Sequence, residues 1–104
     1  MSIDFTPLAV YDLDTTSEYL ENGQPGGGSG FRANLAKLLE QLERFPESGA
    51  LYEPPSPRYP GLRVAQLSKF RRYAVYYRPT TAGLLVVRCL NSSRNIGAIF
   101  GPDD

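Results

Sequence analysis

Arginine and tyrosine side chains within apolar segments are the residues of this chain best suited to chemistry or recognition. Residues 71–78 mix arginine and tyrosine with small or branched apolar side chains, and residues 83–90 form a second apolar run that contains one arginine. Successive side chains point to opposite faces of a strand, so the arginines should leave a sheet on a common side or at its rim. A basic, tyrosine-bearing sheet favours an acidic partner. The candidates for target binding are Arg72, Tyr76, Arg78, Arg88 and Arg94.

Each of these arginines also has a plainer interpretation, which is an ion pair with a helix carboxylate at the surface. Exposed pairs contribute only about 0–1 kcal/mol each, so stability is a weak reason for so many arginines on strands. Tyr73 and Tyr77 share a face with Val75, and core packing is the better interpretation for both. Tyr76 lies on the arginine side and is the better candidate for a contact.

The composition argues against several kinds of catalytic site. The 104 residues include no histidine and a single cysteine, Cys89, so the commonest general base and the usual zinc ligands are lacking. Gly26–Gly30 has neither the spacing nor the lysine of a phosphate-binding loop. We therefore expect no cofactor and no metal. Cys89 lies in an apolar run and is expected to be a packed, inert thiol.

Length and segment pattern favour one domain over residues 1–104 in a reducing location. No apolar run approaches the roughly 18 residues that cross a membrane. The N-terminus lacks the basic start and apolar core of a secretory signal. A lone cysteine fits the cytoplasm. We therefore expect a cytoplasmic protein without a membrane partner.

The zero net charge conceals a strong asymmetry between the two halves of the chain. Residues 1–57 carry nine acidic and three basic side chains, a net charge of −6, and residues 58–104 carry eight basic and two acidic ones, a net charge of +6. Two interpretations stay open. The molecule has one basic face that attracts a partner, or the halves neutralise each other within the fold or across a dimer.

The first half predicts a short strand and two helices. Ile3–Phe5 alternates like a strand, and Thr6-Pro7 suits the start of a helix that ends near Glu21. The glycine-rich composition of residues 24–30 predicts a flexible linker without buried side chains. The sequence is compatible with a native or an engineered linker. In the first helix, the predicted core side is Ala9, Leu13, Thr16 and Leu20, and the predicted water-facing side is Asp12, Asp14 and Glu18.

The second helix is predicted to begin after Ser29 and to end at Phe45-Pro46. Its apolar residues recur at three- and four-residue steps, which predicts a core-facing stripe. The edge of this stripe is also a candidate site for a helix of another protein. The residues proposed for that contact are Leu35, Leu38 and Leu42.

The second half predicts a sheet. After a proline-rich loop over residues 47–60, strands are expected over residues 62–67, 71–78 and 84–90, and their short connections predict an antiparallel meander. The tail over residues 93–100 suits a short helix or an extra edge strand. The fold class is therefore α+β: a short N-terminal strand, an antiparallel helical hairpin and a three-stranded antiparallel meander, with the helices on one face.

This order of elements resembles the RelE/ParE superfamily of bacterial toxins, and most closely its ParE-like branch, which is linked to plasmid stabilisation. The similarity extends over nearly the whole chain and rests on landmarks in each segment. These are Thr6-Pro7-Leu8-Ala9, Asp12-Leu13, Tyr19-Leu20, Leu42 to Gly49, Pro60-Gly61-Leu62-Arg63, Arg72-Tyr73 with Tyr77-Arg78, and Val87-Arg88-Cys89-Leu90 followed by Arg94-Asn95.

The resemblance implies the toxin of a type II toxin–antitoxin system, neutralised by a cognate ParD-like antitoxin. It implies that Leu35, Leu38 and Leu42 are the residues that contact the antitoxin. ParE-like members inhibit DNA gyrase, whereas RelE-like members cleave messenger RNA on the ribosome. The chain departs from the nuclease pattern, since Ala74 replaces an arginine and the C-terminal region has neither tyrosine nor histidine. Many ParE-like proteins also have a histidine where this chain has Asn91.

Three interpretations follow from this resemblance. The first is a gyrase-binding toxin without enzymatic activity. The second is a ribosome-dependent messenger RNA endonuclease, and the third is a non-toxic remnant that still binds an antitoxin. A nuclease would need cations for the phosphate and a proton donor. Its catalytic residues would be Arg72, Arg78, Arg94 and Tyr76.

Overall fold

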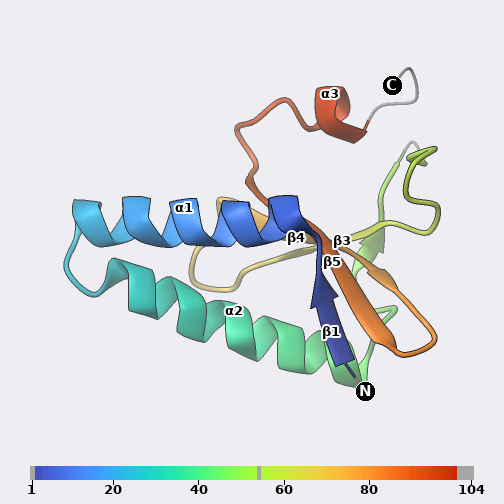
Figure 1. The fold of residues 1–104 in the computed structure, drawn as a ribbon, viewed down its shortest axis with the longest axis horizontal. Coiled ribbons are helices and arrows are strands. Elements are labelled where there is room, and N and C mark those ends of the chain that lie inside the picture. The colour runs from blue at the N-terminus through green and yellow to red at the C-terminus, as the bar shows by residue number, and fades with distance from the viewer. Residues whose placement is uncertain (1, 54, 101–104) are drawn as a thin grey trace.

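The computed structural model describes residues 2–53 and 55–100 and confirms the predicted α+β fold class (Figure 1). The helices are α1 (Pro7–Gly23), α2 (Gly27–Arg44) and α3 (Ile96–Phe100). The strands are β1 (Ser2–Phe5), β2 (Ala50–Leu51), β3 (Arg63–Gln66), β4 (Tyr73–Pro79) and β5 (Gly83–Asn91). The helical hairpin and the antiparallel β3–β4–β5 meander are both present.

The sheet is larger than the predicted meander and is mixed. Its strand order is β1-β5-β4-β3-β2, and β1 pairs with β5 in parallel. The short strand β2 lies within residues 47–60, which were expected to be a loop throughout, and it pairs with β3 through Ala50↔Val64 and Leu51↔Arg63. Prolines follow this strand closely, so the added strand remains two residues long.

Thr6 fixes the start of α1 on the sheet, as its predicted capping role requires. Its Oγ1 accepts a hydrogen bond from the backbone N–H of Ala9 at 3.0 Å and donates one to the carbonyl oxygen of Val87 at 2.7 Å. A bulge between Tyr76 and Tyr77 in the β4–β5 pairing leaves Val87 without a partner in the strand register. The helix cap is thus bonded to an irregular point of the central strand.

The glycine-rich segment is not the flexible linker that the sequence suggested, because α2 begins at Gly27. Gly26 has a φ of +88°, a left-handed conformation that glycine adopts without strain. The carboxylate of Glu21 accepts hydrogen bonds from the N–H groups of Gly26 and Gly28, at 2.9 and 3.0 Å, and these bonds lower the pKa of Glu21. Gly28 is buried, and a Cβ there would lie 2.7 Å from the carbonyl oxygen of Ser17. The glycines therefore let the two helices approach closely.

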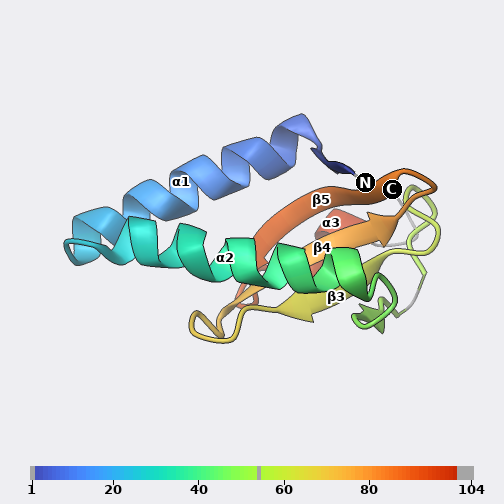
Figure 2. The ribbon, with the colours of Figure 1, turned by 90° about the horizontal axis from the view of Figure 1, so that it is seen from below.

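Helices α1 and α2 run antiparallel and cover one face of the sheet (Figure 2). The apolar stripe of α2 faces this core, as predicted, and supplies four of its twelve buried residues. Tyr77 is fully buried there, and its hydroxyl donates to the carbonyl oxygen of Pro46 and accepts from the N–H of Gly49. Tyr73 is half-buried against the same core, so the core interpretation of both tyrosines is confirmed. The buried members are Ala9, Leu13, Phe31, Leu35, Leu39, Leu42, Leu67, Val75, Tyr77, Leu84, Val86 and Cys89.

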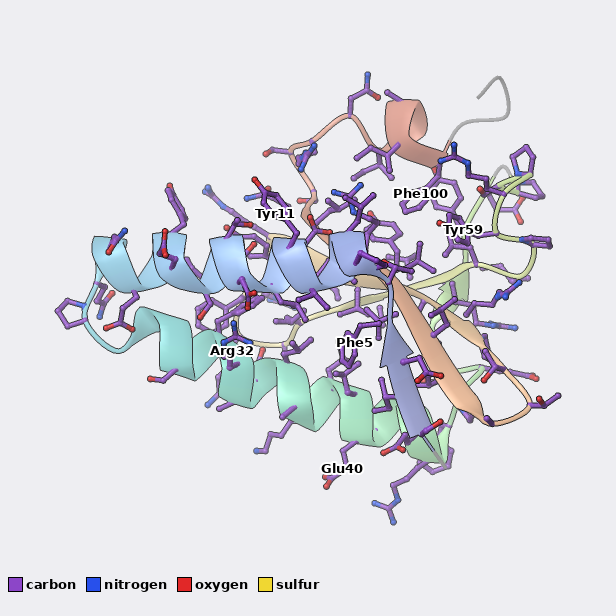
Figure 3. All side chains as sticks on the ribbon, in the orientation of Figure 1. Phe5, Tyr11, Arg32, Glu40, Tyr59 and Phe100 are labelled. Atoms are coloured by element: carbon purple, nitrogen blue, oxygen red, sulfur yellow. The ribbon has the colours of Figure 1, made fainter. Side chains whose placement is uncertain are left out.

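The opposite face of the sheet is covered by α3 and by the loop that leads into β3. Phe100 and Tyr59 lie together above this face (Figure 3), with ring centroids 6.3 Å apart. Phe100 also packs on Tyr52 at 5.6 Å and on Tyr76 at 5.1 Å. Of the two predictions for residues 93–100, the short helix is correct and the edge strand is wrong, and Gly101 lies outside the described residues. Both faces of the sheet are therefore covered.

Candidate functional site

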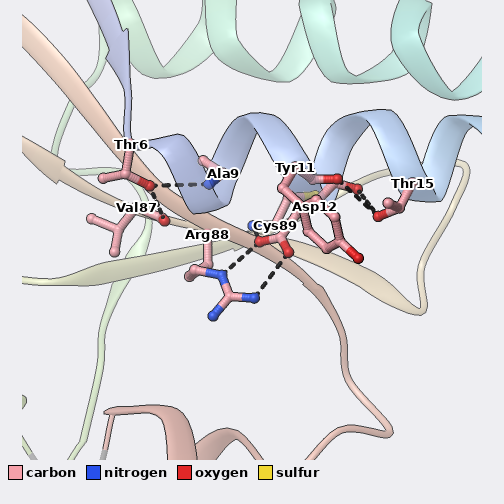
Figure 4. Close-up of polar contacts among 8 residues, drawn as sticks. All are labelled: Thr6, Ala9, Tyr11, Asp12, Thr15, Val87, Arg88 and Cys89. Carbon is pink, nitrogen blue, oxygen red and sulfur yellow. Dashed lines mark hydrogen bonds and ion pairs between the residues drawn. The ribbon is translucent and has the colours of Figure 1, made fainter.

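Arg88 is held in a bidentate ion pair rather than presented to a partner (Figure 4). Its Nε and Nη2 donate to the two carboxylate oxygens of Asp12 at 2.7 and 2.9 Å, and the side chains are only 14% and 5% exposed. The N–H of Cys89 donates to the same carboxylate at 3.1 Å. The hydrogen bond to Asp12 raises the pKa of Arg88. Arg88 therefore serves to fasten α1 to β5.

The burial of Asp12 corrects the prediction that this residue faces water. Helical spacing put Asp12 beside Asp14 on the polar side, but Asp12 lies at the boundary where α1 meets β5. Its carboxylate accepts hydrogen bonds from both Arg88 and the Cys89 amide. By contrast, Asp14 forms an exposed pair with Arg32 at 2.8 Å.

Tyr76 lies beneath the C-terminal helix, which corrects its assignment as a contact or a proton donor. The residue is 6% exposed, and its ring packs on Phe100 and Tyr52, the latter at 6.2 Å. Burial raises the pKa of its hydroxyl, so proton release is disfavoured. The residue is a core side chain of the second face in this structure.

Arg72 and Arg94 are exposed and lie at the same end of the sheet. The N–H of Ser92 donates to the carbonyl oxygen of Arg72 at 2.6 Å, which holds the exit of β5 beside the entry of β4. Neither arginine belongs to an ion pair within the described part of the chain. Lys69 and Arg71 are exposed in the adjacent β3–β4 connection. We call these four residues, Lys69, Arg71, Arg72 and Arg94, the basic rim.

Arg78 is remote from the basic rim, because it lies at the far end of β4. It lies six positions after Arg72, which corresponds to roughly 20 Å of extended chain. Arg78 and Arg63 line an open cleft beside the β4–β5 turn. The arginines and the tyrosine proposed for catalysis therefore do not converge on one point.

The leucines proposed for antitoxin contact belong to the core under the helices. Leu35 and Leu42 are 6% and 1% exposed, and Leu38 is half-buried against the same cluster. The apolar stripe of α2 is buried against the sheet, so neither Leu35 nor Leu42 is accessible to a partner. The sequence pattern indicated burial correctly, but it could not distinguish a stripe that faces the chain's own sheet from one that faces another protein.

The exposed apolar surface lies instead on α1. Leu8, Tyr11 and Tyr19 are 56%, 64% and 71% exposed. Together with Thr15 they are spaced three or four positions apart, so they lie along one side of α1, where Tyr11 can be seen in Figure 3. This α1 stripe borders a groove of about 280 Å³ whose far wall is formed by the end of β5. The groove is lined by Tyr11, Asp12, Thr15, Thr16, Tyr19, Tyr73, Cys89, Leu90, Asn91 and Arg94.

Sequence reasoning missed this stripe, although a signal for it was present. Leu8, Tyr11 and Tyr19 do not fall on the core side of α1 that was read from Ala9 and Leu13. A second apolar side on a surface helix is unusual when nothing covers it. The α1 stripe and the groove are therefore the best candidate for a protein contact, and the basic rim borders it through Arg94.

The described residues offer little for other kinds of site. No cluster of three or more histidine, cysteine or carboxylate side chains suited to a metal occurs within residues 2–53 and 55–100. Over the same residues, every helix is too short or too polar to span a membrane. Burial raises the pKa of the Cys89 thiol to about 12, which keeps it protonated.

Comparison with known proteins agrees with this fold. No curated protein matches the chain. A solved chain from the chromosomal ParDE toxin–antitoxin system of P. aeruginosa superposes with a TM-score of 0.64 at 19% identity, covering 88% of this chain and 95% of that one. The family model for the ParE toxin of the type II toxin–antitoxin system parDE matches residues 3–96. The chain therefore belongs to the ParE toxin family of type II toxin–antitoxin systems.

Proposed function

We propose that this chain is a growth-inhibiting toxin that acts in the cytoplasm by binding DNA gyrase. Membership of the ParE toxin family supports a toxin of a type II system. The observation that carries the choice of mechanism is the separation of the candidate catalytic groups. Arg72 directly precedes β4, Arg78 lies near the other end of that strand, and Tyr76 is covered by Phe100. Binding to a protein target requires no such convergence.

The geometry favours a binding toxin over a messenger RNA nuclease. Cleavage through the ribose 2′-hydroxyl needs a base, an acid and cations around one phosphate. The chain has no histidine, and arginine retains its proton at neutral pH because its pKa lies above about 12. The Tyr76 hydroxyl, the proposed acid, is buried against aromatic rings. These features leave the nuclease as the weaker alternative.

The basic rim is the part of the molecule that we assign to the target. Its four cations are exposed, and none is neutralised by an ion pair within the described residues. A cluster of free positive charge attracts an acidic protein surface and speeds association. Of the residues proposed from the sequence, Arg72 and Arg94 thus remain candidates for gyrase contact, whereas Arg88 and Tyr76 hold the fold together.

We assign the α1 stripe and its groove to a ParD-like antitoxin. Tyr11 and Tyr19 offer large, exposed aromatic surfaces of the type that dominates protein interfaces. Arg94 at the end of the groove would pair with a carboxylate of the antitoxin segment. Because Arg94 also belongs to the basic rim, an antitoxin bound here would cover part of the surface assigned to gyrase. Neutralisation would then follow from direct competition.

Expression of the chain in a bacterial host, alone and together with a ParD-like antitoxin, tests this proposal. We expect growth arrest that the antitoxin relieves, inhibition of purified gyrase in a supercoiling assay, and intact transcripts. Ribosome-dependent transcript cleavage without loss of supercoiling would contradict the proposal in favour of the nuclease. Antitoxin binding without any growth defect would identify a non-toxic remnant.

Paired variants separate the two surfaces. Tyr11→Ala with Tyr19→Ala should weaken antitoxin binding by about 100-fold or more, since interface tyrosines are frequent hot spots, and should leave gyrase inhibition intact. Arg71→Ala with Arg72→Ala should weaken gyrase inhibition and preserve antitoxin binding. Phe45→Ala is the matched control, because Phe45 is 62% exposed and lies outside both surfaces. Equal losses in all three variants would contradict the assignment.

A further inference from the structure

Arg78 is an arginine without a partner in a cleft that no part of the proposed toxin mechanism uses. Its Nε–H is shielded from solvent and makes no hydrogen bond within residues 2–53 and 55–100. The residue also forms no ion pair there. Buried polar groups are nearly always hydrogen-bonded, so a shielded guanidinium N–H without an acceptor is unusual and draws attention to the surroundings of Arg78.

The cleft around Arg78 is large enough for a small anion and carries further donors. It has a volume of about 510 Å³ and lies between the β4–β5 turn and the segment that leads into β3. Arg63 lines it with a guanidinium that is fixed by donation to the carbonyl oxygens of Glu47 and Gly49, at 3.0 and 2.7 Å. These carbonyls are neutral acceptors, so the charge of Arg63 is not cancelled. The lining residues are Glu47, Leu51, Pro60, Gly61, Arg63, Arg78, Pro79, Thr80 and Thr81.

Two threonines of the β4–β5 turn, Thr80 and Thr81, add hydroxyl groups to the lining of the cleft. Thr80 Oγ1 accepts from the N–H of Gly83 at 3.0 Å, which leaves its hydroxyl proton free to donate. Thr81 is exposed on the same turn. Glu47 contributes the one carboxylate among the lining residues, and two arginines outweigh it. The cleft therefore carries a positive charge that suits a single oxyanion.

We propose that this cleft is a phosphate-binding site. Two arginines and two hydroxyls provide donors in several directions, and a phosphate group, with three or more acceptor oxygens, satisfies more of them than a carboxylate does. The phosphate belongs to free phosphate or a phosphomonoester, or to the diester backbone of a nucleic acid, since these share the same acceptor chemistry. The site stands apart from the basic rim at the other end of β4 and from the α1 groove.

Titration of the intact chain with inorganic phosphate tests the proposal directly. Binding is followed by the side-chain Nε–H NMR resonance of Arg78 and, in variants that lack this group, by the backbone amide resonances of Thr80 and Thr81. We expect a saturable shift of the Arg78 resonance at low ionic strength, where screening is weak. Arg78→Gln should weaken phosphate binding about tenfold or more, because it removes a charge-assisted set of hydrogen bonds. Arg78→Lys should restore part of the affinity, since it returns the charge without the planar fork.

Two further comparisons decide the outcome. Arg72→Gln, at the other end of β4, should leave phosphate affinity unchanged, and an equal loss in this control would overturn the site in favour of diffuse attraction. Dimethyl phosphate and acetate serve as the other probes. Tighter binding of inorganic phosphate supports a free or monoester ligand, and tighter binding of dimethyl phosphate supports a nucleic-acid backbone. Acetate binding as tightly as phosphate, or no saturable shift at all, would overturn the proposal.

The proposal stays testable if Arg78→Gln fails to fold. Thr81→Val removes one hydroxyl at an exposed position of the turn and leaves both arginines in place. We expect it to fold normally and to weaken phosphate binding severalfold. Thr81→Ser keeps the hydroxyl and should bind as the original chain does. Equal phosphate affinity in the Thr81→Val and Thr81→Ser variants, together with an unmoved Arg78 resonance, would contradict the assignment.

Discussion

The two faces of the sheet are covered in different ways. On the face under α1 and α2, long helices bury a continuous apolar layer that includes Phe31, Val75 and Val86, each 0% exposed. On the other face, a five-residue helix and an irregular loop cover a layer of aromatic rings around Phe100. The first cover is regular secondary structure with many hydrogen bonds of its own, whereas the second depends on a few side chains.

This difference shows which parts of the molecule can change without loss of the fold. The helix face contains the core and the close approach of Gly28 to α1, so it must form as a unit. The α3 face is fastened mainly by Phe100, whose ring contacts three tyrosines. Short segments with few buried contacts open at lower free energy than the rest of a domain. The α3 face should therefore be the less stable one.

Paired phenylalanine truncations should give the largest difference between the faces. Phe31→Ala removes a fully buried ring from beneath the helices and should lower the free energy of unfolding by about 3–5 kcal/mol. Phe100→Ala should lower it by only about 1 kcal/mol, because α3 can detach without global unfolding. Urea unfolding followed by circular dichroism gives both values. Equal losses would show that α3 is part of the cooperative core.

Hydrogen exchange provides the local test of the same comparison. In the Phe100→Ala variant, we expect faster exchange of the amides in α3 and unchanged protection of those in α2. Phe45→Ala, on an exposed ring, is the control and should change neither. Uniformly faster exchange across α2 and α3 would contradict the idea of an independently opening face.

The sequence predicted the helix face well because that face is built from local periodicity. The stripe of α2 and the alternation of Tyr73, Val75 and Tyr77 each follow from neighbouring residues alone. The arrangement of charges did not follow in this way. Arg88 and Asp12 are 76 positions apart, and nothing near either residue indicates that they pair. The assignment of Arg88 to target binding was therefore made without knowledge of its ion pair with Asp12.

The α3 face was predicted poorly because its cover comes from segments that look irregular. Tyr76 was placed correctly on the side away from the helices, but no pattern indicated that residues 96–100 would fold over it. The glycine-rich segment was misjudged in a similar way. Glycines usually signal a flexible connection, and only the approach of α1 shows that they are needed for helix packing.

The buried ion pair should have the next largest effect, because it joins the two halves of the chain. Asp12→Ala leaves the guanidinium of Arg88 and the amide of Cys89 without their acceptor, so we expect a loss of about 3 kcal/mol in unfolding free energy. Asp14→Ala is the control. It breaks an exposed pair with Arg32 and should cost less than about 1 kcal/mol. Urea unfolding of both variants gives the comparison.

A double replacement sharpens the result on the ion pair. Asp12→Leu with Arg88→Met removes both charges and should recover part of the stability lost in Asp12→Ala, since no unpaired charge remains buried. A double variant no more stable than Asp12→Ala would show that the hydrogen bond to the Cys89 amide, and not the charge pair, is the larger contribution.

The smallest effect concerns the pH dependence contributed by Cys89 on the helix face. Burial raises the pKa of this thiol from 9.0 to about 12 in the folded chain, while the unfolded chain keeps an ordinary value. Between pH 9 and pH 12 the unfolded thiol has therefore lost its proton and the folded thiol has not, so stability falls as the pH rises, by up to about 1.4 kcal/mol per pH unit. Below pH 9 the contribution is constant.

The Cys89→Ala variant tests this dependence. Its free energy of unfolding should decline less steeply than that of the original chain between pH 9 and pH 12, measured by urea unfolding at several pH values. The buried tyrosines Tyr76 and Tyr77 titrate in both proteins and cancel in the difference. Identical slopes would mean that the thiol ionises as easily in the folded chain as in the unfolded one, which would contradict its place in a dry core beneath α1 and α2.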